Sequence, residues 1–184
     1  MNKKGFMMAE VVVVSAIVVV TIGGLYVSYN KIYSKYKTLL SYNDVTTLYR
    51  LGYYRDISIE NNIIEKAFEK LEGKSIIPIY DSINKMNSSF NLPDIEKSDK
   101  ITDTVFMIKT NPNKQIDQNI LPNKIGETQI NPTFKDYANY LSNSVTFRSN
   151  YIMIMERCNL KEDSTKKDID NCQYGYLEVY DGKE

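Results

Sequence analysis

Cys158 and Cys172 are the residues of this 184-residue chain whose side chains could join to form a covalent bond. They enclose the thirteen residues 159–171, NLKEDSTKKDIDN, a segment too polar to hold its shape by packing. A disulfide at the base of this loop would stabilise the fold by roughly 3 kcal/mol, because it restricts the unfolded chain. Such a bond also predicts an extracytoplasmic, oxidising setting. Two reduced cysteines are the alternative.

Composition excludes most familiar catalytic and metal-binding arrangements. The chain has no histidine, which removes the Ser-His and Cys-His pairs and every histidine metal site. Two cysteines are too few for a zinc site of four thiolates, and no Gly-rich phosphate loop or nucleophile elbow is present. No paired-carboxylate motif is formed by Asp56, Glu60, Asp94, Glu96, Asp136 and Glu156. We therefore predict no catalytic residue and no cofactor, and a protein that is not an enzyme.

The polar loop contains three aspartates, Asp163, Asp168 and Asp170, that could offer oxygen ligands to calcium. Their spacing lacks the pattern and the glycine of an EF-hand. A solvated charged loop is therefore the preferred interpretation, and no metal is predicted. Lys and Arg together number 23, as do Asp and Glu. This zero net charge gives no electrostatic reason to predict binding of nucleic acid.

Glu10 is the one charged residue in the apolar run Phe6–Val27, FMMAEVVVVSAIVVVTIGGLYV. A helix of this length would span about 33 Å, enough to cross the hydrocarbon core of a bilayer. A carboxylate within such a segment requires a partner or a function. The sequence thus predicts a membrane-spanning helix over residues 6–27 with Glu10 as a functional residue. A tolerated charge near the membrane interface is the alternative.

The helical period continues beyond the apolar run with an amphipathic pattern. An apolar stripe, which we call the tyrosine stripe, consists of Tyr26, Tyr29, Tyr33, Tyr36 and Leu40. The spacing of three and four residues predicts that one helix continues over residues 28–52 and ends at Gly52. We expect the stripe to pack against a globular domain or against neighbouring helices.

Residues 53–184 are predicted to form a small α+β domain. Ser58 is expected to cap a helix that ends at Gly73, and Thr133 to cap a second, short helix. Strands are predicted at residues 75–80, 102–108, 145–157 and 173–180. Residues 81–100 and 111–131 are polar or rich in Asn, Gln and Pro, and are predicted to be loops.

The first ten residues, Met-Asn-Lys-Lys-Gly-Phe-Met-Met-Ala-Glu, resemble the N-terminal signal of type IV prepilins and pseudopilins. In that family a prepilin peptidase cuts after the glycine of a short basic leader and methylates the new N-terminus. The resemblance implies a leader over residues 1–5, cleavage between Gly5 and Phe6, and N-methylation of Phe6. It also makes Glu10 the fifth residue of the mature chain, which in this family sets the register of subunits during assembly. Met7-Met8-Ala9 departs from the usual Thr-Leu-Ile.

The resemblance implies a pilin-like fold, in which a long N-terminal helix packs on a small antiparallel sheet. The implied function is that of a pseudopilin or minor pilin in a type IV pilus or a type II secretion-like filament. The implied partners are the prepilin peptidase, other pilin-like subunits, membrane lipid, and an inner-membrane assembly platform with its ATPase motor. The domain of residues 53–184 would lie outside the cytoplasm, on a single-pass membrane protein or at the cell surface after assembly.

Two other interpretations stay open at the level of sequence. One is a binding module or enzyme of unknown activity on an ordinary membrane anchor. The other is an exported protein with a conventional signal peptide cut near Gly24. The N-terminus of the mature protein distinguishes them, since it would be methyl-Phe6, intact Met1, or a residue near Gly24.

Overall fold

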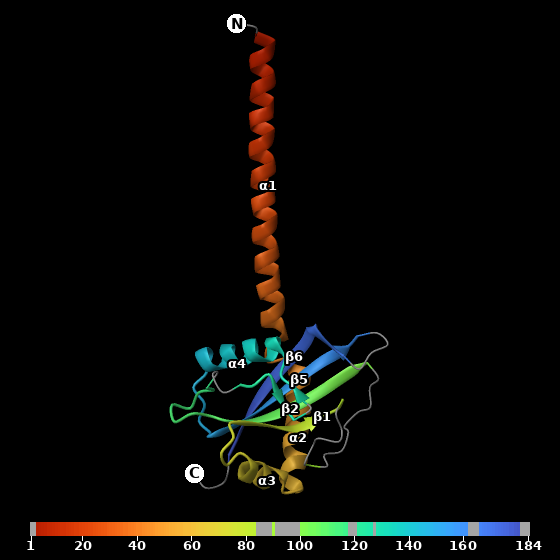
Figure 1. Ribbon diagram of the computed structural model, residues 1–184, viewed down its shortest axis with the longest axis vertical. Coiled ribbons are helices and arrows are strands. Elements are labelled where there is room, and N and C mark those ends of the chain that lie inside the picture. Colours follow the sequence, from red (N-terminus) through yellow and green to blue (C-terminus); the bar gives the residue numbers. More distant parts are fainter. Residues whose placement is uncertain are drawn as a thin grey trace. The chain divides into compact units, whose positions relative to one another are not determined.

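The structure is a computed structural model, and it describes residues 3–83, 90, 100–117, 121–126, 128–161 and 166–180. The chain divides into two compact units, residues 1–40 and 41–184. In the described residues, the first unit consists of helix α1 (Lys3–Ser41) without its last residue. The second is an α+β domain built on an antiparallel sheet. The predicted fold class, a long N-terminal helix with a small antiparallel-sheet domain, is therefore confirmed (Figure 1).

The sheet has four strands in the order β1-β2-β5-β6, and all neighbours are antiparallel. The strands are β1 (Ile76–Asp81), β2 (Ile101–Lys109), β5 (Tyr151–Leu160) and β6 (Lys167–Val179). Each contains a predicted strand or overlaps with one. A second, two-stranded sheet pairs β3 (Lys124–Ile125) with β4 (Thr128–Gln129), inside a segment that the sequence predicted to be a loop.

Helices cover both faces of the four-stranded sheet (Figure 1). Helices α2 (Val45–Glu60) and α3 (Ile63–Lys70) pack on one face, and α4 (Pro132–Ser144) packs on the other. Side chains alternate between the faces, as strand geometry requires. In β2, for example, Val105 and Met107 face α2 and α3, whereas Phe106 and Ile108 face α4.

The predicted single helix over residues 6–52 is wrong. Helix α1 ends at Ser41, and α2 begins at Val45 and runs past Gly52 to Glu60. Asn43 adopts a left-handed backbone conformation with φ of 56°, which cannot continue a right-handed helix. Asp44 then caps α2, because its carboxylate accepts a hydrogen bond from the backbone N–H of Thr47 at 2.9 Å. Gly52 lies within α2, a tolerable cost of about 1 kcal/mol.

Two predicted caps are also wrong. Ser58 lies inside α2, where its hydroxyl donates to the carbonyl oxygen of Tyr54 at 2.6 Å. The next helix starts instead after Asn62, another left-handed residue, with φ of 55°. Thr133 lies within the first turn of α4, whose N-cap is Asn131. Gly73, predicted to end the helix, follows α3 with φ of 82°, a conformation suited to glycine.

Candidate functional site

The residues predicted to be processed lie at the start of α1. Helix α1 begins at Lys3, so Gly5 and Phe6 belong to its first turn. Phe6 and Glu10 are four positions apart, about one helical turn. Glu10 has an exposed side chain. The structure therefore places the predicted cleavage position and the predicted assembly residue at adjacent turns of one helix.

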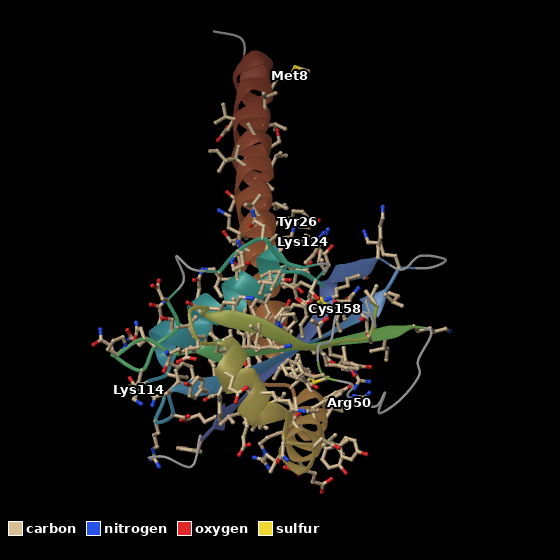
Figure 2. The ribbon with its side chains drawn as sticks, turned by 60° about the horizontal axis from the view of Figure 1, so that its bottom comes forward. Met8, Tyr26, Arg50, Lys114, Lys124 and Cys158 are labelled. Atoms are coloured by element: carbon tan, nitrogen blue, oxygen red, sulfur yellow. A yellow bond between two sulfur atoms is a disulfide. The ribbon has the colours of Figure 1, made fainter. Side chains whose placement is uncertain are left out.

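The segment Glu10–Lys37 is, within the described part of the chain, the one helix long and apolar enough to cross a membrane. The side chains of this segment are exposed, as Tyr26 illustrates where it projects from α1 (Figure 2). The hydroxyls of Ser15 and Thr21 donate to helix carbonyl oxygens of Val12 and Ile17, at 2.9 and 2.8 Å. These bonds satisfy the two hydroxyl donors within the helix, as a hydrocarbon environment requires.

The tyrosine stripe is exposed. Its five members keep between 57% and 66% of their surface accessible, and the rings of Tyr29 and Tyr33 stack with centroids 6.1 Å apart. The helix that packs on the sheet is α2, which buries Leu51, Tyr54 and Ile57. The sequence left two partners open for the stripe, a globular domain or neighbouring helices, and its packing against neighbouring helices stays a prediction.

The predicted disulfide is present. Cys158 on β5 and Cys172 on β6 are directly paired across the sheet, with their Cα atoms 4.0 Å apart. The strands continue beyond this bond, because β5 extends to Leu160 and β6 begins at Lys167. Most of the predicted loop 159–171 is therefore strand. Asp168 and Asp170 lie on β6, and Asp163 lies outside the described residues.

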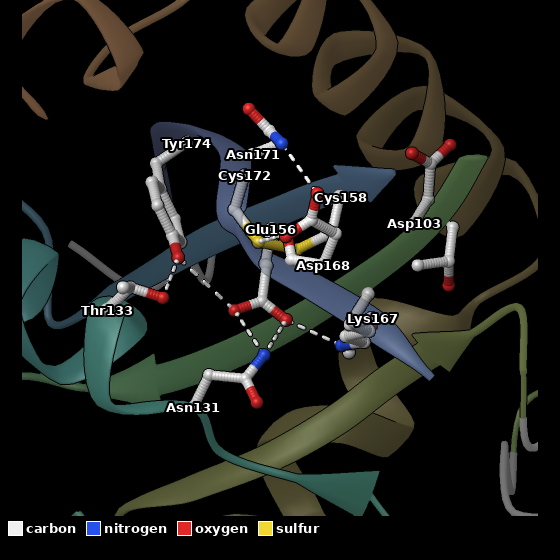
Figure 3. Close-up of a disulfide and its surroundings, with 12 residues drawn as sticks. Asp103, Asn131, Thr133, Glu156, Cys158, Lys167, Asp168, Asn171, Cys172 and Tyr174 are labelled. Carbon is white, nitrogen blue, oxygen red and sulfur yellow. Dashed lines mark hydrogen bonds and ion pairs between the residues drawn. A yellow bond between two sulfur atoms is a disulfide. The ribbon is translucent and has the colours of Figure 1, made fainter. Parts of the chain in front are cut away.

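A buried polar cluster adjoins the disulfide, and sequence reasoning did not find it. Glu156, only 1% exposed, lies on the α4 face of β5 between Ile154 and Cys158. Asn131, at the N-cap of α4, donates its Nδ2 to both carboxylate oxygens, at 3.0 Å from Oε1 and 3.1 Å from Oε2. Lys167, the first residue of β6, donates its Nζ to Oε1 at 2.5 Å. Figure 3 shows Glu156 between these two nitrogens. We call these three residues the Glu156 cluster.

Further hydrogen bonds hold the members of the cluster in place. Thr104 on β2 accepts a second bond from Lys167 Nζ at 2.7 Å. The hydroxyl of Tyr174 lies 2.7 Å from Thr133 Oγ1 and 3.4 Å from Glu156 Oε2. Burial, followed by the charge of Glu156, raises the pKa of the Tyr174 hydroxyl, so this group stays a neutral donor. The Glu156 cluster is thus held by groups from β2, α4 and β6.

Glu156 and the two cysteines do not form a metal centre. The carboxylate of Glu156 and the sulfur atoms of Cys158 and Cys172 lie within 4.8 Å of one another. The two sulfur atoms are bonded to each other, so neither is a thiolate that could bind a metal ion. The signal that could have revealed the cluster is a glutamate at an inward position of an otherwise apolar strand, since a buried charge needs partners.

The start of the globular unit is also fixed to β6. The backbone N–H of Asp44 donates to the carbonyl oxygen of Tyr174 at 3.0 Å. The hydroxyl of Tyr137 donates to Asn43 Oδ1 at 2.6 Å, and the rings of Tyr42 and Tyr137 are 4.8 Å apart. These contacts hold residues 42–44, which separate α1 from α2, against α4 and β6.

The other carboxylates considered in the sequence do not form a site in the described residues. Asp56 is exposed and pairs with its neighbour Arg55 at 2.8 Å. Asp94 and Glu96 lie outside the described residues. The sequence also did not predict the buried pair of Arg50 on α2 with Asp103 on β2, whose Nη2 and Oδ2 atoms are 2.9 Å apart.

No protein-family model matches this chain, and no curated protein or solved structure matches it.

Proposed function

We propose that this chain is a pilin-like structural subunit, a pseudopilin or minor pilin, of a type IV pilus or type II secretion-like filament. The observation that carries the proposal is the arrangement of Gly5, Phe6 and Glu10 at the start of a 39-residue helix whose side chains from Glu10 to Lys37 are exposed. The disulfide in the following domain supports an oxidising compartment, because such bonds persist outside the cytoplasm.

The proposed cycle begins with insertion of α1 into the membrane with residues 1–5 in the cytoplasm. A prepilin peptidase cuts between Gly5 and Phe6 and methylates Phe6. Cutting creates an ammonium group close to the glutamate, and pairing the two charges offsets the cost of holding each in lipid. In the assembled filament the ammonium of one subunit pairs with Glu10 of another. An assembly platform and its ATPase motor then extract the subunits from the membrane.

The test is the chemical identity of the N-terminus in protein isolated from its native membrane. Mass spectrometry is expected to find N-methyl-Phe6 and no trace of residues 1–5. A bulky residue in place of Gly5, as in Gly5→Leu, should leave the leader attached, because a side chain there blocks access to the scissile bond. An intact Met1 in cells with an active peptidase would instead favour the anchored binding module or enzyme. A start near Gly24 would favour a conventional signal peptide.

Substitutions at Glu10 test the assembly step separately from the processing step. Glu10→Val should still be cut after Gly5 and should still enter the membrane, since it removes an intramembrane charge. It should lose crosslinking between neighbouring helices. Glu10→Gln keeps the shape and loses the charge, and so separates electrostatics from packing. If both variants assemble like the wild type, Glu10 has no role in assembly.

A further inference from the structure

The Glu156 cluster places a primary amine, a carboxamide and a carboxylate in one buried site. Lys167 Nζ and Asn131 Nδ2 both bind the same oxygen atom, Glu156 Oε1, at 2.5 and 3.0 Å. The three groups come from β6, α4 and β5, so the fold brings them together and local sequence does not. An amine and a carboxamide can condense to a secondary amide if a nearby group moves the protons.

We propose that Lys167 and Asn131 form an intramolecular isopeptide bond, with Glu156 as the catalytic residue that transfers the protons. The proposal does not depend on the filament function. It assigns a covalent modification to a site that otherwise would be an ordinary buried ion pair with an amide neighbour.

The reaction needs no oxidant, reductant or cofactor. Glu156 accepts a proton from Nζ, and the freed electron pair attacks Asn131 Cγ, so that a C–N bond forms and the carbonyl electron pair moves to Oδ1. When the carbonyl re-forms, the bond from Cγ to Nδ2 breaks, and Glu156 returns the proton to the departing nitrogen. The second Nζ proton follows through the same carboxylate. The products are the amide and one ammonium ion, and Glu156 ends as it began.

The observed hydrogen bonds fit these roles. The carboxylate binds both the attacking and the leaving nitrogen, which is the placement required of a general acid and base (Figure 3). Thr104 fixes the position of Nζ through its hydroxyl. Holding the amine and the carboxamide on one carboxylate makes the condensation an intramolecular reaction, which is faster than the same reaction between separate molecules when the reacting atoms are in contact.

Burial favours amide formation over competing reactions with water. Glu156 is 1% exposed, Asn131 is 9% exposed, and the Lys167 side chain is 12% exposed. Condensation replaces the lysine ammonium by a neutral amide, whose N–H can still donate a hydrogen bond to the buried Glu156 carboxylate.

The bond would tie the N-terminus of α4 to the start of β6, next to the disulfide. The two covalent links would then fix the same end of the β5-β6 hairpin from both sides.

The test is the intact mass of the folded, disulfide-bonded full chain. The wild type is expected to be lighter than its calculated mass by one ammonia. Peptide mapping should recover Lys167 and Asn131 in one branched peptide, with no tryptic cleavage after Lys167. The full calculated mass in the folded wild type would overturn the proposal. So would loss of ammonia without the branched peptide, because that result indicates a succinimide at an asparagine.

Two variants test the assigned roles. Lys167→Arg keeps a cation beside Glu156 but lacks the nucleophilic amine, and Glu156→Gln keeps the shape but cannot accept the proton. Both should keep the full calculated mass. Lys166→Arg, the matched change at the preceding exposed lysine, should still lose ammonia. Loss of ammonia with a branched peptide in folded Glu156→Gln would overturn the role of Glu156, and formation of the bond through Lys166 would overturn that of Lys167.

Discussion

At the scale of single residues, burial separates three tyrosines of the globular unit from an exposed one. Tyr54, Tyr137 and Tyr174 are at most 2% exposed, whereas Tyr49 on α2 is 81% exposed. Burial is the main cause that raises the pKa of each of the three buried hydroxyls above its ordinary value of 10.0. Neighbouring tyrosines add to this effect at Tyr54 and Tyr137, and Glu156 does so at Tyr174. The folded state therefore holds these three protons more tightly than the unfolded state.

The first prediction is a loss of stability in alkali. Below pH 10 both states keep the tyrosine protons, so the contribution to stability is fully present. Above pH 10 the unfolded state releases them first, and the free energy of unfolding falls by up to about 1.4 kcal/mol per pH unit for each buried tyrosine. Urea unfolding in detergent, followed from about pH 8 to about pH 11, should show this slope.

Single substitutions separate the contributions to this slope. Tyr137→Phe should reduce the fall in the free energy of unfolding per pH unit by the contribution of one tyrosine. It also removes the hydrogen bond to Asn43. Tyr49→Phe should leave the slope unchanged, because that hydroxyl is exposed. An identical slope in Tyr137→Phe, Tyr174→Phe and the wild type would show that these tyrosines do not control the alkaline limit.

At the scale of elements, the contact between α2 and β6 depends on a missing side chain. A Cβ atom built on Gly175 would lie 3.0 Å from Leu48 Cδ2, 3.3 Å from Leu48 Cγ and 3.4 Å from the Leu48 backbone nitrogen. Helix α2 thus approaches β6 so closely that a larger residue at 175 must displace the helix or the leucine. Gly52 on α2 is different, since a Cβ there would meet nothing within 4 Å.

The second prediction follows from this contact. Gly175→Val should destabilise the domain by about 1–3 kcal/mol, the usual cost of overpacking, and Gly175→Ala by less. The double variant Gly175→Val with Leu48→Ala should recover part of the loss. Gly52→Ala is the control, and should stabilise α2 by up to about 1 kcal/mol. Chemical denaturation measures all four, and an unchanged midpoint in Gly175→Val would refute the close approach.

Elements whose local pattern decides their structure could be predicted from the sequence. The alternation of Thr104, Phe106 and Ile108 with Val105 and Met107 predicted β2, because each set packs on its own face of the sheet. The break at Asn43 was missed, because apolar residues keep a helical spacing on both sides of it. The signal was present as the drift of Val45, Leu48 and Leu51 onto a new face, together with an Asn-Asp pair suited to a left-handed residue and a cap.

The sequence predicted the disulfide but not the Glu156 cluster, because local sequence is enough to pair two cysteines but not to bring distant residues together. The two cysteines are the only ones in the sequence, and each adjoins a predicted strand, so their pairing could be predicted. The Glu156 cluster could not, since Asn131 and Lys167 lie 25 and 11 residues from Glu156 and on different elements. Only the antiparallel register of β5 and β6 and the packing of α4 bring these side chains together.

At the scale of the whole molecule, the two units differ in what stabilises them. Every buried residue of the described chain belongs to residues 41–184, and the exposed side chains of α1 contribute none. The hydrophobic effect in water can therefore fold the second unit but gives no reason for an isolated α1 to stay in solution. A membrane or neighbouring apolar helices would supply the environment that α1 lacks.

The last prediction uses this division to test where the globular unit begins. A fragment of residues 41–184 should fold, form the disulfide, and unfold at the same temperature as the full chain in detergent. It should remain in the aqueous phase when mixed with lipid vesicles, whereas the full chain should float with them.

A fragment of residues 53–184, cut at the boundary that the helical pattern predicted, should be unfolded or much less stable. It lacks the first half of α2, including buried Leu51, the Asp44 cap, and the bond from Asp44 to Tyr174. Circular dichroism and vesicle flotation measure both properties. Equal stability of the two fragments would mean that the residues between the break and Gly52 do not belong to the folded unit, and flotation of the 41–184 fragment would mean that α1 is not the only membrane-binding part.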